Sequence, residues 1–476
     1  MVRPMKFAEV AAQATGFEAV VGIQGLGFVG TAMATAVADA TDGAGNPRYL
    51  VIGVDQPAGQ ERVDRIARGQ LPFASADPAL KQAFGRAVAR GNLLATTDPD
   101  YFRLANVAIV DIHLDVDVRS GVPTADLGGF SDAVDTLASR MPEGSLIIIE
   151  TTVPPGTTQR VVAPVIRSAL ERRGLAADAI GLAHSYERVM PGPEYFDSIV
   201  RFWRVYAGID DRSAQRCAAF LSTVIDTDKF PLTCLASTTA SETAKVLENS
   251  YRAVNIALID EWSRFCEHLG VDLFEVVDAI RIRPTHSNIR EPGLGVGGYC
   301  LTKDPLFPQV SLNAFYPDSG LEFPLTSAAM TINACMPEAT VDRVTEVLGG
   351  SVTGRRILVM GAAYRSDIGD TRHSPSETLA RRLVADGAVV RVHDPIAEEW
   401  GIGDVGIEKS LPDASEQDAV IFAVGHSAYA EIPIASWLAG STPWIVDANH
   451  VLTDEQRTQL AGIGYPNLFS IGRGYR

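Results

Sequence analysis

The sequence predicts an α/β protein with two doubly wound parallel sheets, joined by a helical central domain that contains one long helix. Three observations lead to this fold class. Short apolar runs alternate with helical segments near the N-terminus, the same alternation returns in the last third, and a long helical pattern separates the two. At about 150 residues per domain, 476 residues indicate roughly three domains. We place them at residues 1–212, 213–336 and 337–476.

The N-terminal domain contains the apolar runs expected of buried parallel strands, with an Ala-rich helical segment at 31–38 after the first. The expected strands are residues 19–23, 49–54, 107–110 and 146–149. Because parallel strands need crossover helices between them, this order predicts a doubly wound sheet.

The central domain is expected to carry one long helix. Thr239 and Glu242 have the spacing of a capping box, and Gly270 is a typical C-terminal stop. The intervening helix, about 28 residues, would be about 42 Å long. It therefore spans domains or packs on a partner chain. One apolar stripe runs along it, formed by Val254, Leu258, Trp262, Phe265 and Leu269.

The C-terminal domain restarts the α/β alternation. Strands are expected at 356–361, 388–393, 419–424 and 444–446, with a helix at 376–385. Its first strand ends in Gly361-Ala-Ala-Tyr364, without the glycine spacing of a dinucleotide loop. A mononucleotide or a nucleotide sugar is therefore the expected ligand of this sheet.

Composition excludes several classes of protein. The net charge of −17 argues against a nucleic-acid partner. The five cysteines are scattered without C-x-x-C spacing, which argues against a zinc site and a disulfide scaffold, so no metal is expected. The first twenty residues include Glu9 and Glu18, and no apolar run approaches the roughly 18 residues of a membrane span. We therefore expect a cytoplasmic protein without a membrane partner.

Gly25-Leu-Gly27-Phe28-Val29-Gly30 follows the first expected strand and opens a helix. Such a loop lets the backbone approach a pyrophosphate at the helix N-terminus. Asp55 ends the second expected strand, where a carboxylate accepts a hydrogen bond from a ribose 2′-hydroxyl and repels a 2′-phosphate. The motif predicts NAD rather than NADP; the alternative is a glycine turn without a ligand.

Four glycines, at positions 293, 295, 297 and 298, precede Cys300. They remove side chains from the approach to the thiol, which favours a nucleophile that meets a bulky substrate. Lys303 or Lys245 would raise the thiolate fraction. The alternative is a cysteine that acts as a small buried hydrophobe.

Other motifs allow two interpretations each. On the long helix, Lys245, Asn249 and Arg252 share one face. This face is either exposed to solvent, or its amide and ammonium groups donate hydrogen bonds to an oxyanion. Residues 150–158 form a hydroxyl-rich turn, which either caps a helix or contacts nicotinamide or substrate. Residues 184–192 contain either a surface ion pair or a carboxylate that acts on a water molecule. Residues 370–375 form either a capped turn or a site where an arginine binds phosphate.

In this order the motifs resemble the UDP-glucose/GDP-mannose dehydrogenase family. The matching strings are GLGFVG, TTVPPGTT, ERVMPG, KVLENSYRAVNIALIDE, GLGVGGYCLTKDP and GAAYRSDIGDTRHSP. The resemblance implies an N-terminal NAD domain, a central helix used for homodimer formation and a C-terminal domain that binds a UDP-sugar substrate. It also implies an NAD-dependent nucleotide-sugar 6-dehydrogenase that serves surface polysaccharide precursor synthesis.

The implied reaction oxidises the sugar C6 alcohol to a uronate with two NAD. Cys300 would carry a thiohemiacetal and then a thioester. Lys245 and Asn249 would stabilise the C6 oxyanion, Asp304 would orient or activate water, and Glu187 would assist proton transfer.

The resemblance implies ligand contacts as well. Thr152 would lie beside the nicotinamide and water, and Arg372 would connect the C-terminal domain to the ligands and contact the cofactor. The expected substrate-binding residues are Glu187, Arg188, Lys245, Asn249, Gly297 and Arg365.

The chain departs from the family pattern at three places. Residues 110–115 replace the usual V-x-T-P string, so no role is assigned to the loop from Asp111 to Asp117. Tyr186 replaces a proline, and Arg365 stands where lysine is common.

The expected substrate is UDP-N-acetylglucosamine or UDP-N-acetylmannosamine, because the ERVMPG string is similar to that branch. The Lys303-Asp304 pair instead resembles the UDP-glucose branch, so UDP-glucose or GDP-mannose stays an alternative. Two further alternatives are a two-electron alcohol dehydrogenase and a non-catalytic nucleotide-sugar sensor.

Overall fold

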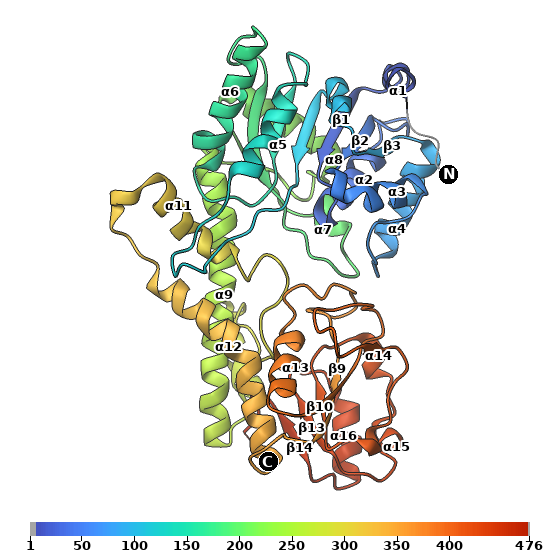
Figure 1. Cartoon of the computed structure of the whole chain (residues 1–476), viewed down its shortest axis with the longest axis vertical. Coiled ribbons are helices and arrows are strands. Elements are labelled where there is room, and N and C mark those ends of the chain that lie inside the picture. The colour runs from blue at the N-terminus through green and yellow to red at the C-terminus, as the bar shows by residue number, and fades with distance from the viewer. Residues whose placement is uncertain (1–5, 475–476) are drawn as a thin grey trace. The chain divides into compact units, whose positions relative to one another are not determined.

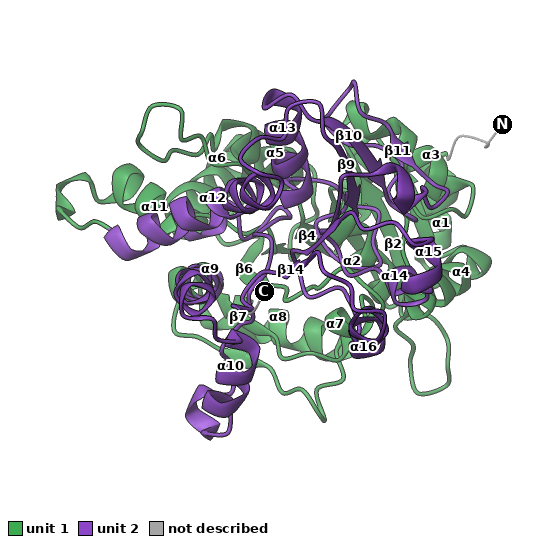
Figure 2. Ribbon diagram, turned by 90° about the horizontal axis from the view of Figure 1, so that it is seen from below, with its two compact units in different colours: residues 1–247, 306–322 green, residues 248–305, 323–476 purple. Residues whose placement is uncertain are grey.

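The computed structural model describes residues 6–474. The contacts between residues divide the chain into two compact units (Figure 2). Unit 1 comprises residues 1–247 and 306–322, and unit 2 comprises residues 248–305 and 323–476. Each unit contains one doubly wound sheet, which confirms the predicted fold class. The three-domain boundaries at 212 and 336 stay a prediction.

Unit 1 is built on an eight-stranded sheet in the order β3-β2-β1-β4-β5-β6-β7-β8. All neighbours pair in parallel except β6 and β7. The four predicted strands are confirmed within one residue. The strands are β1 (Ala19–Gln24), β2 (Tyr49–Val54), β3 (Leu93–Thr96), β4 (Val107–Val110), β5 (Leu146–Ile149), β6 (Gly181–Tyr186), β7 (Val205–Gly208) and β8 (Thr233–Cys234).

Helices cover both faces of this sheet (Figure 1) because its strands are apolar on both sides. Ile147 and Ile149 of β5 pack in one core cluster with residues of α5 and α6, whereas Ile148 packs in the other with residues of α2 and α8. The helices of unit 1 are α1 (Phe7–Ala14), α2 (Phe28–Asp39), α3 (Gln60–Ala67), α4 (Pro78–Arg90), α5 (Gly128–Ala138), α6 (Ala163–Arg172), α7 (Asp197–Val200), α8 (Asp211–Val224) and α11 (Phe307–Phe315).

Helix α9 (Thr238–Leu269) begins in unit 1 and continues into unit 2. Its 32 residues confirm the predicted long helix, and Gly270, at φ +72°, ends it. The predicted capping box is wrong, because the Glu242 carboxylate instead accepts the backbone N–H groups of Gly156 and Thr158, at 2.6 and 2.7 Å. Ser237 Oγ accepts from Ala240 N in its place.

The predicted apolar stripe on α9 is largely exposed. The exposed fractions of Leu258, Phe265 and Leu269 are 42%, 62% and 56%. Packing within the chain therefore does not explain why these positions are apolar, and a homodimer through this helix stays a prediction.

Unit 2 contains a six-stranded parallel sheet in the order β11-β10-β9-β12-β13-β14. Its strands are β9 (Arg356–Met360), β10 (Val389–His393), β11 (Ile407–Glu408), β12 (Ala419–Phe422), β13 (Trp444–Asp447) and β14 (Leu468–Ser470). Its further helices are α10 (Leu273–Arg281), α12 (Pro324–Val347), α13 (Pro375–Ala385), α14 (Ser427–Ala430), α15 (Ile434–Trp437) and α16 (Asp454–Gly462).

The loop after β9 differs physically from a dinucleotide loop. The fully buried Asp394 carboxylate accepts the N–H groups of Ala362 and Ala363, at 2.8 and 3.1 Å. The protein's own carboxylate thus occupies donors that a phosphate would need. This agrees with the sequence-based expectation that the second sheet binds no dinucleotide.

Among the described residues, no helix combines the length and the apolar character needed to cross a membrane.

The Glu242 contact predicts a large effect of a small change. Glu242→Gln leaves one acceptor oxygen for two buried N–H donors, so we expect a loss of about 1–3 kcal/mol in the free energy of unfolding. Urea unfolding measures it, with Glu261→Gln on the exposed face of the same helix as the control. Equal unfolding midpoints for Glu242→Gln and the unchanged protein would contradict the assignment.

Candidate functional site

The glycine loop of unit 1 links the end of β1 to the start of α2. A Cβ at Gly25 would lie 2.3 Å from the Asp111 carbonyl oxygen, and one at Gly30 would lie 2.0 Å from the Gly25 oxygen. A Cβ at the exposed Gly27 would meet no atom within 4 Å. Two glycines therefore serve the fold, and the third leaves open space before a helix N-terminus that no described side chain caps.

The other predicted cofactor residues surround this loop. The ring of Phe28 stacks on that of Phe73, with centroids 4.5 Å apart, and Val29 is half-buried. The Asp55 carboxylate accepts Gln56 N at 2.8 Å and Arg62 Nε at 2.7 Å. Arg62 was not predicted from the sequence. Its position on α3, seven residues after Asp55, was the signal that could have identified this contact. Bare helix donors and an oriented carboxylate fit the pyrophosphate and a ribose of NAD.

A buried acid pair lies where β4 and β5 end. Glu150 forms an ion pair with Arg204, and both side chains are at most 3% exposed. Burial, and then the adjacent Glu150, raise the pKa of Asp111 well above its usual range. The neutral form of the Asp111 carboxyl group is therefore favoured, and in that form its O–H can donate a hydrogen bond to Glu150. Sequence analysis assigned Asp111 no role, because neither partner is near it in the sequence.

Thr151 joins the loop after β5 to the loop after β4 through hydrogen bonds. Its hydroxyl accepts Ile112 N at 3.0 Å and lies 3.0 Å from the Val110 oxygen, to which it can donate. The neighbouring Thr152 is half-buried. The predicted contact of Thr152 with nicotinamide stays a prediction.

Glu187 and Lys245 form a buried pair between the end of β6 and α9. Lys245 Nζ donates to the Glu187 carbonyl oxygen at 2.7 Å and to Oε1 at 3.2 Å, and both side chains are under 10% exposed. Arg188 instead donates to Trp203 O and Tyr186 Oη, at 2.8 and 3.0 Å. The sequence left open whether residues 184–192 hold a surface ion pair or a carboxylate that handles water. The ion pair of Glu187 with Lys245 is buried, and such a pair is suited to proton transfer.

His184 lies on β6 near this pair. Burial, and then the Lys245 charge, lower the pKa of His184 to about 3. The imidazole is therefore neutral at physiological pH, and its Nδ1 lies 2.8 Å from Ser241 Oγ. It adds no positive charge beside Lys245.

In unit 2, Asp304 joins α9 to the segment that carries Cys300. Asn249 Nδ2 donates to Asp304 Oδ2 at 2.8 Å, and Lys303 Nζ donates to Oδ1 at 2.7 Å. The Asp304 N–H donates to the Cys300 carbonyl oxygen at 2.8 Å. Asp304 is fully buried, whereas Cys300 is exposed. The thiol thus lies on a short turn that a buried carboxylate holds in place.

The glycines before Cys300 have a packing role that sequence analysis missed. A Cβ at Gly297 would lie 2.6 Å from Tyr364 Cβ, and one at Gly298 would lie 2.8 Å from the Tyr364 ring. Gly298, at φ +80°, also donates its N–H to the Arg372 carbonyl oxygen at 3.2 Å. The loop therefore needs glycine at these positions to lie against residues 364–373.

The two predicted arginines of the C-terminal sheet differ in environment. Arg372 forms a bidentate pair with Asp370, at 2.6–3.1 Å, and lies 5.9 Å from the Tyr299 ring. Arg365 is exposed. Asp370 therefore orients Arg372, whereas Arg365 is open to a ligand.

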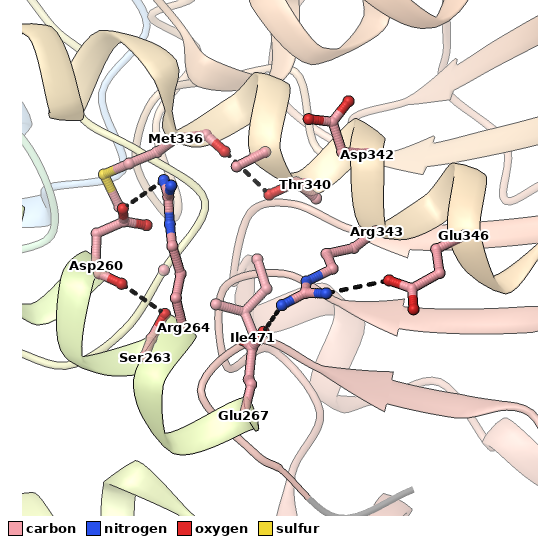
Figure 3. Close-up of a pocket in the computed structure, with 12 residues that line it drawn as sticks. Asp260, Ser263, Arg264, Glu267, Met336, Thr340, Asp342, Arg343, Glu346 and Ile471 are labelled. Carbon is pink, nitrogen blue, oxygen red and sulfur yellow. Dashed lines mark hydrogen bonds and ion pairs between the residues drawn. The ribbon is translucent and has the colours of Figure 1, made fainter. Parts of the chain in front are cut away.

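A separate pocket of about 230 Å³ lies between α9 and α12 (Figure 3). Arg343 bonds Glu267 and Glu346, each at 3.1 Å, and Arg264 lies 2.7 Å from Asp260. Because the Arg343–Glu267 pair joins α12 to α9, it stabilises the contact of the two helices. In residues 6–474, no group of three or more His, Cys, Asp or Glu side chains forms a metal site.

The catalytic candidates thus fall into two sets. Unit 1 contains Glu187 with Lys245, and also Thr152, whereas unit 2 contains Asn249 with Asp304 and Cys300. Lys245 and Asn249 lie one turn apart on α9, so the helix links the sets. The glycine loop at the start of α2, with Asp55 after β2, is typical of the NAD-binding domain of NAD-dependent dehydrogenases.

Three segments of the chain match the domains of one family, in order. They are the NAD binding domain at 19–224, the central domain at 239–335 and the UDP binding domain at 358–454 of the UDP-glucose/GDP-mannose dehydrogenase family. The chain belongs to this family. It is an NAD-dependent nucleotide-sugar dehydrogenase with a UDP-sugar binding domain.

Known proteins agree with this assignment. A UDP-N-acetyl-D-mannosamine dehydrogenase from Methanocaldococcus jannaschii is 30% identical over 408 residues, 85% of each chain. The structure of a UDP-D-ManNAc dehydrogenase from Pyrococcus horikoshii is similar over 96% of this chain and 99% of that chain, with a TM-score of 0.79 and 26% identity. A UDP-glucose dehydrogenase from Pyrobaculum islandicum gives a TM-score of 0.78 and 25% identity over 96% and 98% of the chains.

The glycine loop predicts a clean separation of binding from folding. Gly27→Ala places a methyl group in open space, so we expect an unchanged unfolding midpoint but NAD binding weakened by about tenfold or more. Gly30→Ala places it against the Gly25 oxygen and is expected to lower the midpoint. Calorimetric NAD titration and thermal unfolding measure both. Unchanged NAD affinity in Gly27→Ala would show that the backbone does not approach the cofactor there.

The acid pair predicts a pH dependence of stability. Because the folded chain keeps the Asp111 proton after the unfolded chain has lost it, stability falls as pH rises above the ordinary aspartate range. Asp111→Asn keeps a donor to Glu150 and removes this slope. Urea unfolding between about pH 4.5 and 8 compares the two, with the exposed Asp115→Asn as the control. If the free energy of unfolding depends on pH in the same way for Asp111→Asn and the unchanged protein, the raised pKa of Asp111 is refuted.

Proposed function

We propose that this enzyme oxidises the C6 alcohol of a UDP-N-acetylhexosamine, with UDP-N-acetylmannosamine as the first candidate, to the uronate. The proposal rests above all on the exposed thiol of Cys300, held on a turn by Asp304 and Asn249. An exposed nucleophile allows two successive oxidations without release of the aldehyde. The product is a precursor for surface polysaccharide.

The glycine loop and Asp55 would hold NAD⁺, which would supply the hydride acceptor for C6 in each of the two oxidations. In the first, the C6 hydroxyl loses its proton, and the Lys245 ammonium and the Asn249 amide stabilise the C6 oxygen. The hydrogen bond from Lys245 to Glu187 provides a route for that proton, because the two groups are buried and in contact.

The Cys300 thiolate then adds to the aldehyde, so a C–S bond forms and the carbonyl oxygen gains a proton, giving a thiohemiacetal. Loss of the hydroxyl proton and of a second hydride from C6 produces the thioester. Glu187 assists these proton transfers. Thr152 would contact the nicotinamide of the bound cofactor.

Hydrolysis completes the cycle. Water, oriented or activated by Asp304, adds to the thioester carbonyl, and the C–S bond breaks with the thiolate as leaving group. The products are the carboxylate and the Cys300 thiolate. Arg188, Gly297, Arg365 and Arg372 complete the ligand contacts in this proposal.

The choice of sugar rests on the ERVMPG string and on relatives. The relatives from M. jannaschii and P. horikoshii are named for N-acetylmannosamine. The structural similarity to a UDP-glucose dehydrogenase, at a TM-score of 0.78, keeps UDP-glucose as the second candidate. A homodimer through α9 is supported by the exposed stripe of Leu258, Phe265 and Leu269.

Counting NADH per sugar tests the reaction. With a panel of UDP- and GDP-sugars, we expect two NADH per molecule of UDP-N-acetylmannosamine. One NADH per sugar would indicate a two-electron alcohol dehydrogenase, and none with any sugar would indicate a sensor. Cys300→Ser is expected to abolish the four-electron oxidation, whereas the exposed Cys335→Ser on α12 keeps it. Unchanged turnover in Cys300→Ser would remove the thiol from the mechanism.

A further inference from the structure

The loop that follows β9 has a tip at residues 365–369, which begins with the exposed Arg365. Asp367, in the middle of this tip, has a φ of +57°, in the left-handed region that residues with a side chain seldom adopt. Such a conformation costs free energy and persists only where the surrounding contacts require it. The position of Arg365 therefore depends on the contacts that fix Asp367.

Two consecutive residues hold Asp367. The Asp367 N–H donates to His426 Nδ1 at 3.0 Å, and Asp367 Oδ1 accepts from Ser427 N and Oγ, at 2.9 and 3.0 Å. Within residues 6–474, no other residue of the tip forms a hydrogen bond with a different segment. His426 therefore fixes the backbone of the tip, and Ser427 fixes the side chain of Asp367.

His426 is in turn fixed by a carboxylate. Its Nε2 lies 3.0 Å from Asp394 Oδ2, and both side chains are completely buried. Burial opposes ionisation of Asp394, but hydrogen bonds from His426 and from backbone N–H groups hold its pKa well below the usual range. Because an ionised carboxylate only accepts, the imidazole proton lies on Nε2, and Nδ1 remains the acceptor for Asp367. One tautomer of His426 thus serves both bonds.

The strand order explains how these residues reach the loop. In the sheet, β9 lies between β10 and β12; Asp394 directly follows β10, and His426 lies shortly after β12. Because parallel strands end at the same edge, the loop after β9 leaves the sheet between them. Asp394 also accepts the N–H groups of Ala362 and Ala363, so the loop is held at its start as well as at its tip.

We propose that His426 is a positioning residue of the nucleotide-sugar site, which holds the tip of the loop in the conformation that presents Arg365 to the substrate. The inference rests on the proposed function, in which Arg365 contacts the nucleotide sugar. The tip, His426 and Asp394 all lie in the segment that matches the UDP binding domain, residues 358–454. His426 itself contacts no ligand in this proposal, because its side chain is completely buried.

Loss of the Nδ1 acceptor leaves the Asp367 N–H unpaired in a conformation that is already unfavourable. The tip then occupies other conformations for most of the time. Because apparent affinity falls in proportion to the fraction that is competent to bind, a tip in place for about a tenth of the time weakens binding about tenfold.

Two substitutions at position 426 separate the two hydrogen bonds. His426→Asn places an amide oxygen at the depth of Nδ1, where it can accept the Asp367 N–H but cannot reach Asp394. His426→Gln places its amide at the depth of Nε2, where it can donate to Asp394 but leaves the Asp367 N–H unpaired. In calorimetric titrations with UDP, without NAD⁺, we expect His426→Gln to weaken binding about tenfold. His426→Asn should bind UDP with nearly the affinity of the unchanged protein.

His393→Gln is the matched control. His393 is buried at the end of β10, and its Nδ1 lies 3.1 Å from Tyr429 Oη, without a hydrogen bond to the tip. All three variants lose a buried hydrogen bond, so each is expected to lower the thermal unfolding midpoint. Only His426→Gln should lose UDP affinity. Affinity losses that follow the fall in midpoint across the three variants would show a merely structural role.

A double-variant cycle tests whether His426 acts through Arg365. Arg365→Gln removes a guanidinium that pairs well with phosphate, and we expect it to weaken UDP binding about tenfold. Adding His426→Gln should then cause little further loss, because no guanidinium remains to be positioned. Additive losses overturn the proposal, and so does normal UDP affinity in His426→Gln.

Turnover separates this inference from the proposed function. In NADH assays, His426→Gln should raise KM for the UDP-sugar and leave kcat nearly unchanged. If no nucleotide sugar yields NADH but the UDP affinities follow the expected pattern, the proposed oxidation fails and the positioning role stands. If a UDP-sugar yields NADH and KM is the same in His426→Gln and the unchanged protein, the positioning role fails.

Discussion

Burial of charged and polar side chains along the first turns of α9 is the constraint on which the site depends. Glu242, Lys245 and Asn249 are each at most 7% exposed, and such groups are stable only with good partners. Each finds its partner on a different loop, at residues 156–158, 187 and 304. One helix therefore orders three loops, and these carry the proposed catalytic residues Thr152, Glu187 and Asp304.

Sequence reasoning succeeded where local pattern determines structure. β2, β4 and β5 begin and end where the apolar runs do, because strands buried on both faces leave no polar interruptions. It failed where partners are distant along the chain. Glu242 fits a capping box locally, yet donors 84 and 86 residues away prevail, and the Glu150–Arg204 pair spans 54 residues. One sequence gives no signal for such pairs.

The candidate site shows the same division. The glycine loop, Asp55 and the Cys300 segment were identifiable because each is a contiguous motif or follows a strand. The raised pKa of Asp111, and the packing of Gly297 and Gly298 on Tyr364, follow from three-dimensional contacts alone. The missing glycine spacing after β9 distinguished the two sheets in the sequence, but the physical basis of the difference did not show there: α2 begins with open donors, whereas in unit 2 the Asp394 carboxylate accepts the N–H groups of Ala362 and Ala363.

The contact between Gly297 and Tyr364 limits how this lineage can diverge. A Cβ at position 297 would lie 2.6 Å from Tyr364 Cβ and 2.8 Å from the His373 carbonyl oxygen. The first obstacle is removed only by glycine at 364, because every other residue has a Cβ, and the second is main chain and stays whatever residue is at 373. A residue other than glycine at position 297 therefore requires the backbone at His373 to move. The segment of Gly297 and the segment of His373 must consequently change together during evolution.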